Sequence, residues 1–273
     1  MADPFRDRVA VITGAAAGIG AGVAQAFAAR GARLVLADVD EAALVDTARR
    51  LTEGGASVLA VPTDVGDRAR VEALADAAWG RFGAVHVVCN NAGVGVFGEI
   101  AQASHNDWEY TMRVNFWGVA HGVEAFVPRL IAQRQGGHVV NTASMAGLVG
   151  MQWLGIYCAS KFAVVGLSEA LARELRPHGI GVSVLCPMIV DTQINANSER
   201  LRPAHLGGTG GAGAPAPNQP SMAGGVIAVD EVARRVVRGI ERNDLYILTH
   251  PEQREFLRRR AERLDAVFAS DRW

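Results

Sequence analysis

Short β-branched runs alternate with longer helical patterns along most of the chain, and this alternation restricts the possible folds more than any other feature. The runs are nearly continuous in apolar residues, as expected of strands covered on both faces of a parallel sheet. They indicate strands at 8–13, 32–37, 56–61, 84–89, 137–143, 180–186 and, more weakly, 245–249. Helix-length segments fall between them at 18–30, 40–53, 67–82, 106–133, 155–178 and 229–242. Strands alternating with helices predict right-handed crossovers, and therefore an α/β fold: a doubly wound parallel sheet of about seven strands flanked by helices.

Two segments interrupt this regular pattern. Residues 207–225, GGTGGAGAPAPNQPSMAGG, are too poor in large apolar residues to build a core. Because only about 48 residues follow them, too few for a typical second domain, we expect a single domain over 1–273. Its flexible substrate-loop region would lie at about 190–228, with the glycine-rich part as a mobile loop over a ligand site. The C-terminal tail, at about 251–270, reads as an amphipathic helix with these residues on one side: Phe256, Leu257, Leu264, Val267 and Phe268.

The charge balance and the cysteines exclude several classes of function. Lysine and arginine number 27 against 28 aspartate and glutamate, so no basic excess indicates a nucleic acid or an anionic membrane surface as partner. Neither the seven histidines nor Cys89, Cys158 and Cys186 show metal-ligand spacing, so we expect reduced, mostly buried thiols and no metal site. The first residues are charged where a signal peptide would be apolar, and no apolar stretch is long enough to span a membrane. We therefore expect a cytoplasmic protein without a membrane partner.

A glycine-rich turn, TGAAAGIG at 13–20, joins the first strand to the first helix. Gly14, Gly18 and Gly20 would let the backbone approach a pyrophosphate, whose charge a helix N-terminus favours. Asp38 ends the second strand, where a carboxylate can accept hydrogen bonds from the adenosine ribose hydroxyls and would repel a 2′-phosphate. No arginine follows Asp38 directly. The pattern therefore favours a Rossmann-type site for NAD over NADP, with a plain helix N-cap as the alternative role of Asp38.

The sequence YCASK at 157–161 places Tyr157 and Lys161 one helical turn apart, on the same face. A phenol has a reference pKa near 10, too high for a base at neutral pH. A nearby ammonium group favours the phenolate and lowers that pKa. Tyr157 is therefore predicted to exchange a proton with a substrate, unless the pair is an ordinary surface Tyr–Lys contact.

Taken together, the ordered motifs resemble those of the short-chain dehydrogenase/reductase family in its single-domain form. The match covers roughly residues 5–192, and its motifs follow one another in the order TGxxxGIG at 13–20, Asp64 with Val65, NNAG at 90–93, Asn115, Ser144, and Tyr157 with Lys161. One departure is PMIVDT at 187–192, where Met188 replaces the glycine that the family often has. The segment at 198–204, the glycine-rich loop and the chain ending are also similar to bacterial NAD-dependent dehydrogenases of aryl-ether benzylic (C-alpha) alcohols.

The resemblance implies roles for individual residues. Ser144 would orient the substrate oxygen, Tyr157 would act as general acid and base, and Lys161 would also bind the nicotinamide ribose. Asn115 would help a proton relay through water, or alternatively hold a kink in its helix. The implied cofactor site comprises Gly14, Gly18, Ile19, Gly20, Asp38, Asp64, Val65, Asn90, Asn91, Ala92, Gly93, Tyr157, Lys161, Pro187, Ile189 and Thr192.

The expected substrate pocket is apolar. Its candidate residues are Val94, Phe97, Met151, Trp153, Leu154, Met188 and Ile194. Such a lining favours a bulky apolar or aromatic secondary alcohol or ketone as small-molecule substrate, and so an NAD-linked alcohol dehydrogenase or ketoreductase. Steroid and terpene alcohols remain alternatives, and so does a catalytically silent dinucleotide-binding sensor or scaffold.

The resemblance also implies a homodimer or homotetramer. The helices at 106–133 and 155–178 commonly pair with their copies, and small residues on the second helix would allow close approach. The same small residues could instead pack against the sheet. They are Ala159, Ala163, Gly166 and Ala170.

Overall fold

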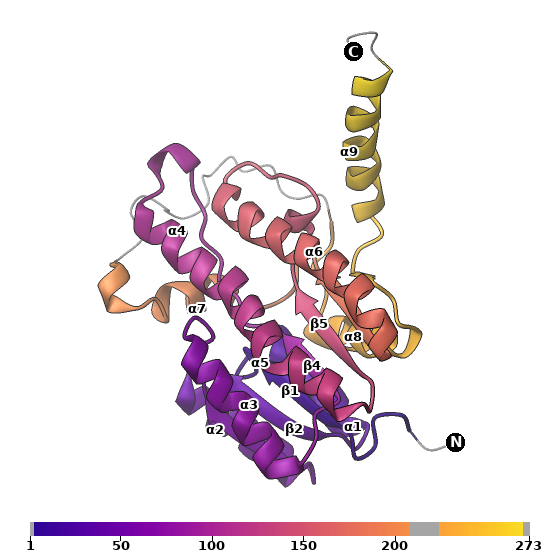
Figure 1. The fold of residues 1–273 in the computed structure, drawn as a ribbon. Coiled ribbons are helices and arrows are strands. Elements are labelled where there is room, and N and C mark those ends of the chain that lie inside the picture. The colour runs from indigo at the N-terminus through magenta and orange to yellow at the C-terminus, as the bar shows by residue number, and fades with distance from the viewer. Residues whose placement is uncertain (1–2, 208–223, 270–273) are drawn as a thin grey trace.

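A seven-stranded parallel sheet forms the centre of the computed structural model, which describes residues 3–207 and 224–269. The strand order is β3-β2-β1-β4-β5-β6-β7; Figure 1 labels β1, β2, β4 and β5 of this sheet. The strands are β1 Val9–Thr13, β2 Arg33–Asp38, β3 Val58–Pro62, β4 Val87–Asn90, β5 Gly137–Thr142, β6 Ile180–Cys186 and β7 Tyr246–Leu248. The predicted fold class is confirmed.

Helices cover both faces of the sheet because successive strand residues point to opposite sides. The helices are α1 Gly18–Ala29, α2 Glu41–Glu53, α3 Arg68–Phe82, α4 His105–Met112, α5 Gly118–Gln133, α6 Gly155–Leu175, α7 Ile194–Arg200, α8 Val229–Arg242 and α9 Gln253–Phe268. In β1, Ala10 and Ile12 enter one buried cluster with α1, α2 and α8, whereas Val9 and Val11 enter another with α3, α5 and α6.

The helix predicted at 106–133 consists of three parts. α4 and α5 are joined by a π-helical segment, Arg113–Trp117, which adds a local bulge to the helix. The hydrophobic pattern did not indicate this change, because it reports periodicity over several turns and not a single wide turn.

The predicted substrate-loop region is described only in part. Between 190 and 207 the chain forms α7 and a short 3₁₀ turn, Ala204–Leu206, and Val190 forms a bridge with Ile227. The glycine-rich segment predicted to be a mobile loop lies almost entirely outside the described residues.

The C-terminal helix α9 projects from the body of the molecule (Figure 1). Its first residue, Gln253, is fully buried, whereas residues 261–268 are exposed. The apolar stripe predicted there is half-buried at Phe256 and Leu257 and exposed at Leu264.

One described stretch, Gly155–His178, is long and apolar enough to cross a membrane by length and composition alone. It contains α6, which packs on β6 and buries the polar residues Ser160, Lys161 and Ser168. A helix that packs in a protein core has the same apolar composition, so these contacts account for it.

Candidate active site

The crevice lies where the sheet reverses its winding, between β1 and β4, at the carboxyl ends of the strands. Asn91 joins the two strand ends, because its backbone N–H donates to Thr13 Oγ1 at 2.9 Å and its Nδ2 donates to the Thr13 carbonyl at 3.0 Å. Gly14 has φ +65°, and a Cβ atom there would lie 2.8 Å from Ala92 Cα. Only glycine fits this turn without displacing its neighbours.

Asp38 is held by two backbone amides at the edge of this crevice. Its Oδ2 accepts from the Ala16 N–H at 2.9 Å, and its Oδ1 accepts from the Asp40 N–H at 3.0 Å. The N-cap of α2 is Asp40, whose carboxylate accepts from the Ala43 N–H, so the alternative interpretation of Asp38 as that cap is wrong. Each Asp38 oxygen retains a lone pair for a ligand.

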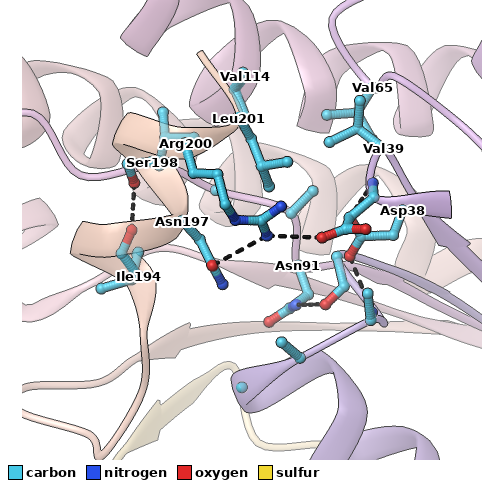
Figure 2. A pocket seen from close by; sticks show the side chains of 18 of the residues that line it. Asp38, Val39, Val65, Asn91, Val114, Ile194, Asn197, Ser198, Arg200 and Leu201 are labelled. Carbon is cyan, nitrogen blue, oxygen red and sulfur yellow. Dashed lines mark hydrogen bonds and ion pairs between the residues drawn. The ribbon is translucent and has the colours of Figure 1, made fainter. Parts of the chain in front are cut away.

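A cavity of about 440 Å³ opens over these groups (Figure 2). The predicted residues that line it are Gly14, Gly18, Ile19, Asp38, Asp64, Val65, Asn91, Ala92, Gly93, Val94, Thr192 and Ile194. Several further lining residues were not predicted from the sequence, among them Asp40, Tyr110, Arg113, Asn197 and Arg200. No local motif marks these residues, since they reach the cavity from the start of α2, from α4, from the π-helical segment and from α7.

Two ion pairs lie in the cavity wall. Arg113 Nη2 is 2.7 Å from Asp64 Oδ2, and Asp64 Oδ1 also accepts from the Gly66 N–H at 2.9 Å. Arg200 Nη2, at the end of α7, is 2.7 Å from Asp40 Oδ2. The Arg200 guanidinium holds the pKa of the Asp40 carboxyl below its usual range, so Asp40 is charged at neutral pH.

Ser144, Tyr157 and Lys161 lie together beside the Gly93 end of the cavity. Ser144 follows β5, and its Oγ donates to the Pro187 carbonyl at 3.4 Å and lies near the Tyr157 phenol. Lys161 Nζ is 5.6 Å from the centre of the Tyr157 ring and donates to the Thr142 carbonyl at 2.9 Å. A Cβ atom on Gly93 would lie 3.4 Å from Lys161 Nζ. The three side chains do not themselves line the cavity, but Lys161 borders it at Gly93, which does.

The prediction that the protein lowers the Tyr157 pKa is wrong for the chain alone. Burial raises the pKa of Tyr157 to about 12, although the nearby Ser144 hydroxyl opposes that rise. Burial also lowers the pKa of Lys161 to about 8, because a low-dielectric environment disfavours the ammonium form. Desolvation is therefore the largest influence on both pKa values, an effect that spacing in the sequence cannot report.

Asn115 lies in the π-helical segment and is fully buried. Its Oδ1 accepts from the Val94 N–H at 2.8 Å, and its Nδ2 donates to the Val94 carbonyl and to Ser160 Oγ. Both amide hydrogens are therefore committed to protein partners. This geometry favours the structural alternative for the side chain, which fixes the Val94 backbone next to the cavity.

Other predicted residues lie outside the lining of this cavity. They are Gly20, Asn90, Pro187 and Ile189 of the cofactor set, and Phe97, Met151, Trp153, Leu154 and Met188 of the substrate set. Asn90 is buried beneath the crevice and donates to Asn141 Oδ1 at 2.9 Å. Trp153 has φ +67°, a strained backbone for a bulky residue, and its carbonyl accepts from the Gly98 N–H at 2.9 Å.

A buried polar group at the end of β7, which we call the C-terminal brace, comprises Thr249, His250 and Gln253. Thr249 Oγ1 accepts from the Met188 N–H at 3.2 Å, and His250 Nε2 lies 2.8 Å from the Gly225 carbonyl. Gln253 Nε2 donates to the Cys186 carbonyl at 2.8 Å. The brace therefore holds the backbone that enters the segment at 187–192, and it was not predicted from the sequence.

The described cysteines are free and buried. Among residues 3–207 and 224–269, no group of three histidine, cysteine or acidic side chains could hold a metal ion.

Comparisons with known proteins agree with this geometry. A family model described as short chain dehydrogenase matches residues 8–202. A CLA biosynthesis dehydrogenase/reductase from Lactiplantibacillus plantarum is 34% identical over 284 residues, which cover 98% of this chain and 96% of that protein. A C alpha-dehydrogenase from Sphingobium sp. is 36% identical over 260 residues, covering 93% and 84%. A solved short chain dehydrogenase/reductase from Burkholderia phymatum, in complex with NAD, has a TM-score of 0.87 at 43% identity and covers 96% of this chain and 95% of that chain.

Proposed function

The chain belongs to the short-chain dehydrogenase family of oxidoreductases, and from that premise we propose that it transfers hydride between NAD and a bulky apolar or aromatic secondary alcohol or its ketone. The resemblance stated from the motifs is thereby confirmed. The observation that carries the proposal is the approach of Lys161, which lies beside Tyr157, to Gly93 in the lining of the crevice.

The residues of the crevice fit an adenine dinucleotide. The turn at Gly14 leaves no room for a side chain, so a pyrophosphate can approach the backbone there. No side chain caps the first turn of α1, whose N–H groups are suited to phosphate oxygens. Asp38 is already oriented by the Ala16 and Asp40 amides and can accept from ribose hydroxyls. The same carboxylate disfavours a 2′-phosphate, which supports NAD over NADP.

In the proposed mechanism the protein orients the alcohol and moves one proton. The substrate oxygen lies between the Ser144 hydroxyl and Tyr157 Oη, and Tyr157 Oη takes the alcohol proton in oxidation or donates it to the ketone in reduction. When bound, the oxidised dinucleotide supplies the hydride acceptor and a positive ring charge. With a pKa of about 12, Tyr157 holds its proton in the chain alone, which suits the donating direction. Lys161, placed under the ring by Thr142, favours the phenolate when it is protonated.

The apolar residues near the crevice support a bulky substrate. Val94 and Val96 are buried in a small cluster with Tyr110 and Leu206, and Ile194 is exposed at the cavity edge. The similarity to a C alpha-dehydrogenase supports an aromatic, benzylic alcohol as the first class to test.

The test is NADH formation at mildly alkaline pH across benzylic, terpene, steroid and short aliphatic secondary alcohols, with Tyr157→Phe beside the wild type. We expect Tyr157→Phe to lose at least about 100-fold in kcat/KM, because proton transfer in the transition state is removed, while NADH binding is kept. Tyr246→Phe is the matched control, since that phenol is exposed on β7 and bonds Glu169. Near-normal turnover by Tyr157→Phe would refute the mechanism. NADH binding without turnover on any alcohol would instead favour the silent dinucleotide-binding alternative.

A further inference from the structure

Arg200 reaches across the cavity from α7 to the far wall (Figure 2). Its Nη2 donates to Asp40 Oδ2 at 2.7 Å and to Asn197 Oδ1 at 3.2 Å. The Arg200 side chain is 55% exposed, whereas that of Asp40 is 16% exposed. The arginine is therefore the adjustable partner of this pair, and the carboxylate is fixed.

The ion pair lies next to the carboxylate that would hold the adenosine ribose. The Asp40 N–H donates to Asp38 Oδ1 at 3.0 Å, so a single residue connects the Arg200 guanidinium to Asp38. A phosphate on the 2′-oxygen of a ribose bound by Asp38 would therefore be held in this corner of the cavity.

Arginine is the side chain best suited to bind a phosphate, because its planar guanidinium donates two parallel hydrogen bonds. Of the described residues that line the cavity, two are arginines, and both are ion-paired: Arg113 with Asp64 and Arg200 with Asp40. A count of basic residues alone would suggest a phosphate site here, but each guanidinium already has a carboxylate partner.

We propose that Arg200 is a binding residue for a ribose 2′-phosphate whose guanidinium is kept from the phosphate by its ion pair with Asp40. Asp40 thereby masks Arg200 and contributes to selection of NAD over NADP. The inference rests on the proposed function, because it assumes that the cavity holds the adenosine end of a dinucleotide. Asp40 acts in two ways. Its negative charge adds to the repulsion of a 2′-phosphate by Asp38, and its Oδ2 accepts the Arg200 hydrogen bond that a phosphate would otherwise accept. Selectivity is then a property of three side chains on two elements, β2–α2 and α7, and not of Asp38 alone.

The deciding variant is Asp40→Asn. Asparagine is as good an N-cap as aspartate, so the hydrogen bond from the Ala43 N–H to the cap of α2 is kept while the charge is lost. The freed Arg200 can then form charge-assisted hydrogen bonds to a 2′-phosphate. We expect the ratio of kcat/KM with NADP to kcat/KM with NAD to rise about tenfold, and the Kd for NADPH to fall in parallel.

Two further variants separate unmasking from a simple loss of negative charge. Asp40→Asn combined with Arg200→Gln should lose the gain, because no guanidinium remains to receive the phosphate. Asp46→Asn is the matched control: Asp46 lies on the same helix and pairs with Arg49, away from the cavity, and its removal should leave the NADP/NAD ratio unchanged.

The outcomes are distinguishable. No rise in Asp40→Asn overturns the proposal, and so does a rise that persists in the double variant, because it would come from reduced repulsion alone. Binding of NADH by the wild-type protein, measured first by fluorescence, tests the proposed function separately. Absence of dinucleotide binding in the wild type would refute both.

Discussion

Lys161 is a buried ammonium group, and its burial should make the stability of the protein depend on pH. Only 2% of the residue is exposed, and burial lowers its pKa from 10.5 to about 8. Above pH 8 the folded chain releases this proton while the unfolded chain keeps it, so the unfolded state binds more protons. The contribution of Lys161 to the free energy of unfolding therefore rises with pH between about 8 and 10.5, by roughly 3 kcal/mol in total.

Urea unfolding of the wild type and of Lys161→Met at several pH values measures this contribution. Titrating groups that Lys161 does not affect behave alike in both proteins and cancel in the difference. We expect the free energy of unfolding of the wild type to increase relative to that of Lys161→Met as pH rises from 8 to 10.5. A difference that stays constant with pH would show that Lys161 keeps its ordinary pKa in the folded chain.

At the residue scale, the sequence predicted that Tyr157 and Lys161 lie close together, but it did not predict their pKa values. The spacing of Tyr157 and Lys161 placed them on one face of a helix, and the structure has them there. The direction of the Tyr157 pKa could not be predicted, because it depends on burial by the surrounding chain. For the same reason Arg200 was missed: its partner Asp40 lies 160 residues away.

At the element scale, the C-terminal brace connects β7 to the segment that follows β6. A carbonyl only accepts hydrogen bonds, so His250 Nε2 must donate to Gly225. In a neutral His250, Nδ1 then accepts from Thr249 Oγ1, which in turn accepts from the Met188 N–H. The tautomer is thus assigned from its partners, and a continuous chain of hydrogen bonds fixes the Met188 backbone.

Replacing Thr249 by valine keeps the shape of the side chain but leaves the Met188 N–H without its acceptor. We expect the free energy of unfolding to fall by about 1–3 kcal/mol, and kcat to fall about tenfold as the segment at 187–192 shifts. Thr249→Ser keeps the hydroxyl and should restore kcat. Kinetics and urea unfolding of both variants are the measurement; a Thr249→Val protein that loses stability but keeps kcat would make the brace purely structural.

The elements themselves could be predicted where their signal is periodic. Every strand and most helices follow hydrophobic patterns that local sequence carries. The π-helical segment at Arg113–Trp117 and the short α7 have no such pattern, because their form depends on contacts distant in sequence, such as that of Asn115 with Val94. The brace was missed for the same reason.

At the scale of the whole molecule, α6 has small residues on its exposed face and not on the face that packs against the sheet. Ala159, Gly166 and Ala170 are exposed, so the alternative that these three pack against the sheet is not what the structure has. We propose that this face pairs with its copy in a homodimer or homotetramer, with close approach of the helices as the physical basis. The strand order of one chain does not determine the oligomeric state, because an interface involves a second chain.

Gly166→Arg tests this assembly. A Cβ atom at Gly166 meets nothing within 4 Å, so the variant should fold, while the arginine prevents close approach of a second helix. We expect a shift to monomer in size-exclusion chromatography with light scattering. Gly80→Arg, at an equally open glycine on α3, is the control and should keep the wild-type mass. An unchanged mass for Gly166→Arg would place the interface elsewhere.

The position of Gln253 has a consequence for exchanging parts between relatives. The family model ends at residue 202, yet the amide of Gln253 holds the Cys186 carbonyl from the first position of α9. In a chimera, a junction before Thr249 would remove the brace, and a junction directly after Gln253 would still exchange the half-buried Phe256 and Leu257. Only the exposed residues of α9 from 261 onward can be exchanged without changing a buried or half-buried side chain.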